Sequence, residues 1–201
     1  EKLTVSDSKK LFHEQFPYVI PGLYKRIVDE LLVELNLLNH QNEFIQDFLF
    51  CVGLTNTFDE LMEGYKPKEH IDLLFDSLCN STNLKSNDIR QISKKSTEEF
   101  KGMSSADISN LLKEKITSNL YCSRLLNLGI YQIVSRSTDF KETKESEKFK
   151  LISEIFENLN LSATKAEKDI GIYKSSIKKL EQAKELIEEL KTKDKKNKKL
   201  E

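Results

Sequence analysis

The apolar residues between Pro21 and Leu38 recur with the period of a helix. They follow one unusually wide face: Leu23, Ile27, Val28, Leu31, Leu32, Val33, Leu35, Leu37 and Leu38. A helix that is apolar over so much of its circumference is expected to be buried on several sides. The pattern therefore predicts a central helix around which the other helices of a bundle pack.

The same period predicts further helices along the chain. They are expected over about residues 7–15, 44 or 47 to 62, 67–78, 88–100, 106–134 and 148–158. The stretch 106–134 is either one long helix or two helices with a bend near Ser118 and Asn119. Polar composition predicts a loop over 80–87 and an exposed connector over 138–147.

The last helix is expected to begin at the N-cap residue Ser162 and to run to about Lys191 or beyond. It has one thin apolar edge: Ile170, Tyr173, Ile177, Leu180, Ile187 and Leu190. Lys184 interrupts this edge, whose spacing is otherwise typical of a coiled coil. We therefore expect the helix to project from the molecule or to lie along its surface. The chain divides into a helical body, 1–160, and a long C-terminal helix with a Lys-rich end, 161–201.

Composition supports an all-α fold and adds one feature, a basic C-terminal end. The chain has few helix breakers, with 6 Gly and 3 Pro in 201 residues, and 32% of its residues are charged. The formal net charge of -1 predicts no bulk attraction to nucleic acid. Residues 165–201 hold twelve Lys against eight acids, so a basic end follows a mildly acidic body.

No run of eighteen apolar residues, the length needed for a membrane-spanning helix, occurs in the sequence. Because the chain begins at Glu1 without Met, a targeting peptide upstream is left open.

The residues that usually carry chemistry are scattered. Cys51, Cys79 and Cys122 form no CxxC pair and are expected to be reduced thiols. The glycines are too far apart for a phosphate-binding loop, and no Glu-x-x-His pair or HExxH motif occurs. Carboxylate groups such as Asp29 and Glu30 are typical of ion pairs on charged helices. The sequence predicts no catalytic residue, no cofactor and no metal site.

Two regions are candidate partner-binding surfaces. The first is the polar edge of the predicted central helix with the corner that follows the next helix: Tyr24, Arg26, Asp29, Glu30, Glu63 and Tyr65. Charges on a largely buried helix must be paired, so this edge is either an internal network or a contact with a partner. The second is the apolar edge of the last helix, at Tyr173, Ile177 and Leu180. The Lys-rich run 193–199 is interpreted as a solvated tail in preference to a phosphate- or lipid-binding segment, because polar residues dilute it and no aromatic residue interleaves with it.

Five segments together resemble the thylakoid formation protein family, the photosystem II biogenesis and repair factors of cyanobacteria and plastids. They are TVSDSK (4–9), IP (20–21) with YKRIVDELLVE (24–34), FDELMEGY (58–65), YCSRLLNLGIY (121–131) and YKSSIKKLEQA (173–183). Lys25 stands where an Arg is expected and Asn127 where a small apolar residue is usual, and neither departure changes the assignment.

The resemblance implies an all-helical, non-enzymatic protein that is peripheral to the thylakoid membrane on its cytoplasmic or stromal side. It implies binding to the membrane-bound protease FtsH, support for its accumulation and a role with photosystem II assembly or repair intermediates. The abundance of Lys, Asn and Ile favours a cyanobacterial over a plastid origin. We hypothesise an adaptor whose last helix is a docking arm. The alternative is a membrane-surface module, active in thylakoid organisation, that binds lipid through its basic C-terminal helix. An enzyme or a nucleic-acid-binding protein has less support.

Overall fold

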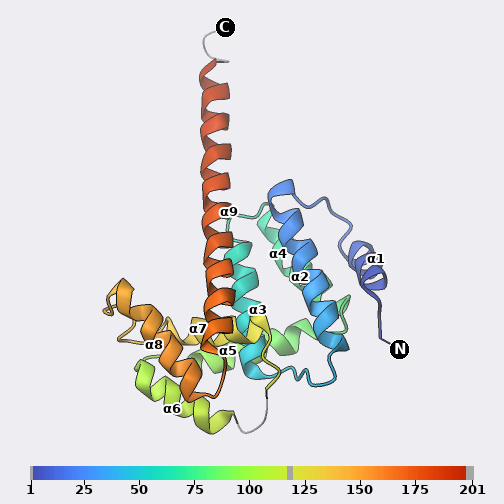
Figure 1. Cartoon of the computed structure of the whole chain (residues 1–201). Helices are drawn as coiled ribbons and strands as arrows, with labels where there is room; N and C mark the ends of the chain where they lie inside the picture. Colours follow the sequence, from blue (N-terminus) through green and yellow to red (C-terminus); the bar gives the residue numbers. More distant parts are fainter. Residues whose placement is uncertain (1, 117–119, 198–201) are drawn as a thin grey trace.

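The computed structural model describes residues 2–116 and 120–197 and is all-helical over these residues (Figure 1). The prediction of an all-α fold is therefore confirmed. A short 3-10 helix, Lys68–His70, precedes α4. The α-helices are α1 (Val5–Gln15), α2 (Gly22–His40), α3 (Phe48–Leu61), α4 (Ile71–Asn80), α5 (Ser86–Glu99), α6 (Ser105–Lys115), α7 (Arg124–Val134), α8 (Glu145–Asn158) and α9 (Ala163–Asn197).

The buried centre of the bundle is α3, which packs against α5, α7 and α9. Most of its residues are buried, including Gly53, and α3 crosses α7 at very short range. A Cβ atom at Gly53 would lie 1.8 Å from the Leu125 carbonyl oxygen, and one at Gly129 would lie 2.0 Å from the Leu49 carbonyl oxygen. The two helices therefore touch backbone to backbone, which only glycine permits.

The expectation that residues 21–38 form the central helix of the bundle is wrong, because α3 occupies that place. Helix α2 lies at one side of the bundle and packs against α1 and α4. Its inner side chains, among them Leu31, Leu32 and Leu35, are buried in the core. Its opposite side is uncovered, and Leu37 is 52% exposed. The wide apolar face that predicted burial on several sides is thus covered on one side only.

Most helix starts follow local capping chemistry. Thr4 and Asp7 form a capping box at α1, in which the Thr4 hydroxyl accepts from the Asp7 N–H at 3.1 Å. The Asp47 carboxylate caps α3, and the Ser162 hydroxyl accepts from the Lys165 N–H at 3.2 Å ahead of α9, as the sequence predicts. The ambiguous stretch 106–134 is two helices, α6 and α7, and the predicted bend at Ser118–Asn119 falls outside the described residues.

The connector expected over 138–147 is partly buried and shorter than predicted. Phe140 is buried, and Asp139 accepts from the Ser105 N–H at 2.8 Å and from the Ser105 hydroxyl at 2.5 Å. These hydrogen bonds lower the pKa of Asp139 against the opposing effect of burial. Asp139 therefore fixes the start of α6, and α8 already begins at Glu145.

Helix α9 starts within the bundle and extends well past it (Figure 1). Its first half packs against α7 and α8, and its C-terminal half continues away from the other helices. The predicted division at residue 160 lies just before this helix, and the Lys-rich end extends to and beyond the last described residue. None of the described helices is long and apolar enough to span a membrane.

Candidate partner-binding surface

The outer side of α2 forms a groove of about 810 Å³. The residues that line it come from α2 and the segments next to it: Gly22, Lys25, Arg26, Asp29, Glu30, Val33, Glu34, Leu37, Leu38, Gln41 and Tyr121. They fall on one stripe of the helix, because they recur at three- and four-residue intervals. Charged side chains occupy the N-terminal half of the stripe, and apolar side chains occupy the C-terminal half. The groove can thus bind a partner both by apolar contact and by charge.

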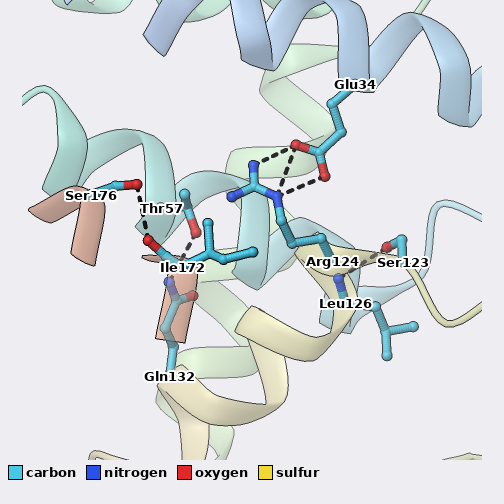
Figure 2. A network of polar contacts seen from close by, with 8 residues as sticks. All are labelled: Glu34, Thr57, Ser123, Arg124, Leu126, Gln132, Ile172 and Ser176. Atoms are coloured by element: carbon cyan, nitrogen blue, oxygen red, sulfur yellow. Dashed lines mark hydrogen bonds and ion pairs between the residues drawn. The ribbon is translucent and has the colours of Figure 1, made fainter. Parts of the chain in front are cut away.

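An ion pair between α2 and α7 fixes the wall of this groove. The Arg124 Nε donates to both Glu34 carboxylate oxygens, at 3.1 and 3.2 Å, and the Arg124 Nη2 donates to Glu34 Oε2 (Figure 2). Burial by itself would lower the pKa of Arg124, but the Glu34 carboxylate beside it raises that pKa above its ordinary value. The pair is bidentate and largely buried, so it orients Arg124 as well as neutralising it.

The segment next to this pair is tied to α9. The Ser123 hydroxyl accepts from the Leu126 N–H at 3.1 Å and so caps α7 (Figure 2). Asn127 donates from Nδ2 to the buried carboxylate of Asp169 at 2.8 Å and accepts from the Cys122 thiol at 3.2 Å. Asn127 stands where a small apolar residue was expected, and the structure gives it a partner on α9. These bonds place Tyr121 beside the apolar half of the α2 groove.

The charged half of the groove is open to solvent. Arg26 and Glu30 pair at 2.7 Å, but their side chains are 87% and 62% exposed, so the pair contributes little to stability. Asp29 is half-buried, and within the described ranges it has no ion-pair partner. The groove thus presents Lys25 and Arg26 at one end and carboxylates near its middle. Of the predicted site residues, Arg26, Asp29 and Glu30 lie together here.

The corner that follows α3 is a joint within the molecule. Tyr24 and Tyr65 are both buried, with their rings edge to face and their centroids 5.1 Å apart. The Tyr24 hydroxyl and the Lys184 ammonium both donate to the Glu63 carbonyl oxygen, the first at 3.3 Å. Gly64 adopts a φ of 82°, which favours glycine. The corner therefore joins α2, α3 and α9, and the predicted site residues Tyr24 and Tyr65 are not on the surface.

The predicted apolar edge of α9 also serves the interior. Tyr173 and Leu180 are buried, and Ile177 is half-buried against both apolar clusters of the core. The Tyr173 hydroxyl donates to the Glu60 carboxylate, and burial together with this carboxylate raises the pKa of Tyr173. Beside it, Gln132 on α7 donates to the Thr57 hydroxyl on α3 at 3.1 Å (Figure 2). The interruption at Lys184 is explained by its bond to the Glu63 carbonyl oxygen.

Sequence reasoning missed the apolar half of the groove. Val33 and Leu37 were assigned to the core because a helical pattern does not show which part of a wide apolar face is covered. Tyr121 was found only within a family motif. The signal available in the sequence was the excess width of the apolar face itself, which is greater than one packing surface needs.

Two of the three cysteine thiols are buried. Burial raises the pKa of the Cys51 and Cys79 thiols to about 12, so both are held in their unreactive protonated form. No group of three His, Cys, Asp or Glu residues suited to a metal ion occurs in the described part of the chain. The clearest feature of the surface is therefore the groove on α2.

Comparison with known proteins agrees with this all-helical architecture. The model of the family described as thylakoid formation protein matches residues 4–201. The chain belongs to the thylakoid formation protein family. It is 70% identical to Protein Thf1 of Prochlorococcus marinus subsp. pastoris over 199 residues, which cover 99% of this chain and 98% of that protein. It is 36% identical to Protein Thf1 of Parasynechococcus marenigrum, with 98% and 93% covered.

A solved structure of Psb29 has the same fold. It superposes with a TM-score of 0.84 at 26% sequence identity and covers 98% of both chains. The similarity therefore includes the long C-terminal helix as well as the bundle. The thylakoid formation protein family, the cyanobacterial relatives and the helical fold together identify a protein of thylakoid formation.

Proposed function

We propose that this chain is a non-enzymatic adaptor in photosystem II biogenesis and repair that binds the membrane-bound FtsH protease complex. It would act at the cytoplasmic side of the thylakoid membrane as a peripheral protein and support accumulation of the protease. Membership of the thylakoid formation protein family supports the cellular role. The proposal of a direct protein partner rests on the groove of α2.

The uncovered side of α2 is the observation that carries the adaptor function. Contact of apolar side chains with water is unfavourable, and their burial by a partner stabilises the complex by about 25 cal/mol per Å² of apolar surface. Leu37 supplies such a side chain, and Arg26, Asp29 and Glu30 beside it supply charges that select the partner. The helix is held from behind by the core and from the side by Arg124, so little ordering is needed on binding.

A tagged pull-down from mildly solubilised cyanobacterial membranes tests the proposal. Full-length protein is compared with a chain that ends at Lys184, and FtsH in the eluates is quantified by mass spectrometry. This truncation is chosen because Tyr173 and Leu180 belong to the core, so a cut before them would expose it. We expect both chains to recover FtsH.

The two other results have distinct meanings. Recovery by the full chain alone would move the contact from the groove to the end of α9. Recovery by neither chain, when both give the helical circular dichroism of the folded protein, would contradict a direct interaction with the protease. The same eluates show whether photosystem II assembly intermediates are recovered with it.

A membrane-surface module is the second candidate, favoured by the exposed Lys191 and Lys193 and by the lysines that follow them. The described part of this helix beyond Leu180 is not basic, however. Over residues 181–197 the acids and the lysines balance, for a net charge of zero: Glu181, Glu185, Glu188, Glu189 and Asp194 against Lys184, Lys191, Lys193, Lys195 and Lys196. Co-sedimentation with anionic vesicles that disappears at high salt would support this candidate, since attraction to lipid headgroups is screened.

A further inference from the structure

The side chains of the α2 groove are ordered by kind along one line of the helix. The line runs through Arg26, Glu30, Val33 and Leu37, at steps of four, three and four residues. At about 100° per residue, these side chains stay within about 60° of one another, on the side turned away from the core. At 1.5 Å per residue, Arg26 and Leu37 are about 16 Å apart along the axis, which is three turns. A ligand that covers the line therefore meets charges at one end and apolar side chains at the other.

Along this line, α2 offers its ligand side chains and no backbone groups. The helix is continuous from Gly22 to His40, so the N–H and C=O groups between Arg26 and Leu37 are bonded within it. An extended peptide that adds as a strand needs such groups unpaired. An amphipathic helix needs only side chains at three- and four-residue steps, which is the spacing of the line. The geometry therefore favours a helical ligand.

The charges of the groove favour a protein over a membrane or a nucleic acid. Two cations and three carboxylates line it: Lys25, Arg26, Asp29, Glu30 and Glu34. Anionic lipid and nucleic acid bind where positive charge is in excess, which is not the case here. The carboxylates lie near the middle of the line and the cations at one end. The ligand must therefore carry both signs of charge in a matching order.

The same order disfavours a second copy of α2 as the ligand. An antiparallel copy would set Arg26 against Leu37 and Glu30 against Val33, so that charges would meet apolar side chains. A parallel copy would set Arg26 and Glu30 at the level of their own equivalents, which places like charges together. The groove is therefore complementary to a segment of a different protein.

We propose that the α2 groove binds an amphipathic helix of three turns or more, whose inner line is apolar, then basic, then acidic. Its apolar side chains lie against Val33 and Leu37. Its basic side chain lies at the level of Glu30, and its acidic side chain lies at the level of Arg26. A slip of one turn would set a charge against Val33 or an apolar side chain against Glu30, so the charges fix the register. This inference names the kind of segment that the docking role proposed above requires, and it rests on that role.

Exchange of two charges tests their order. Arg26→Glu/Glu30→Arg keeps the composition, the net charge and a possible ion pair four residues apart, but it reverses the charges along the groove. Titration with the purified FtsH complex should show a Kd at least about tenfold higher than that of the wild type. Glu98→Lys/Lys101→Glu is the matched control. It exchanges a similarly exposed pair at the end of α5, outside the groove, and should leave Kd unchanged.

Photo-cross-linking tests the helical form of the ligand. A photoreactive phenylalanine derivative replaces Lys25 or Gln41, one at a time, so the four side chains of the line are kept. Full-length protein is irradiated with solubilised cyanobacterial membranes, and the cross-linked residues are identified by mass spectrometry. The two positions are about 24 Å apart along the axis, so a helix in the groove is cross-linked at residues about 16 apart in one segment. An extended peptide is cross-linked at residues about 7 apart. We expect the helical spacing.

The outcomes separate this inference from the proposed function. An unchanged Kd for a folded Arg26→Glu/Glu30→Arg protein, or cross-links to FtsH at the extended spacing or in unrelated segments, would overturn the helical ligand and leave FtsH as the partner. Cross-links at the helical spacing in a protein other than FtsH would support the helical ligand and contradict the proposed partner. Cross-links to no protein from either position would overturn both.

Discussion

Glu34 and Arg124 are ninety residues apart in the sequence and form a bidentate ion pair between α2 and the start of α7. The pair fixes the edge of the α2 groove and lies one residue from the cap of α7. Its side chains are only 21% and 28% exposed, so removal of one partner leaves the other charge poorly solvated.

Arg124→Met should therefore lower the free energy of unfolding by about 1–3 kcal/mol. This loss is smaller than that expected for a fully buried ion pair, because both side chains are partly exposed to solvent. Arg26→Met is the control, because the Arg26–Glu30 pair is exposed to solvent and contributes little to stability. Urea unfolding followed by circular dichroism measures both. Equal losses in the two variants would show that Arg124 has no special structural role.

The crossing of α3 and α7 gives a second prediction. Gly53→Ala places a methyl group on the Leu125 carbonyl, so the helices must separate, and we expect a loss of about 3 kcal/mol or more. Gly171→Ala is the same chemical change in α9, where a Cβ atom meets nothing within 4 Å. There, alanine should stabilise the helix by up to about 1 kcal/mol. Thermal unfolding distinguishes the two, and a Gly53→Ala protein as stable as the wild type would contradict the close crossing.

The buried thiols predict a dependence of stability on alkaline pH. In the unfolded chain Cys51 and Cys79 ionise near their ordinary pKa of 9.0, whereas burial raises the pKa in the native state to about 12. Between these values the native state holds more protons, so the free energy of unfolding falls as pH rises. The slope is about 1.4 kcal/mol per pH unit for each thiol.

Urea unfolding under reducing conditions at about pH 8 and pH 10.5, on either side of the ordinary thiol pKa, measures this slope. The variant Cys51→Ala/Cys79→Ala should show a shallower decline, because its unfolded state releases fewer protons. Tyr173 contributes in the same direction in both proteins, since its native pKa is also raised. If the decline is the same in both proteins, the two thiols are not protected in the native state.

The helices and their caps could be predicted from the sequence because they depend on local spacing, as at Ser162. The choice of the central helix could not. Helix α3 is the more apolar of the two, but it is shorter than α2, and no local pattern shows that Gly53 meets Gly129 of α7 at the close crossing that places α3 in the middle. A helical pattern measures how apolar a face is, and tertiary contacts decide which face is covered.

The candidate site was predicted in part. Arg26, Asp29 and Glu30 do share an exposed surface, and their role in binding stays a prediction. The sequence places Tyr24 and Tyr65 with the charges of the polar edge and its following corner, and Tyr173 on the thin apolar edge of the last helix. In the folded chain their hydroxyls and rings serve internal joints, a pairing between distant segments that no local pattern displays.

The affinity of the chain for a purified FtsH complex shows whether the α2 groove is the docking surface. Wild type, Leu37→Glu and Leu73→Glu are compared by titration; Leu73 is the matched control, an exposed leucine on α4 outside the groove. We predict that Leu37→Glu raises Kd at least about tenfold, the equivalent of about 1.4 kcal/mol, while Leu73→Glu leaves Kd unchanged. An unchanged Kd for a folded Leu37→Glu protein would contradict the account.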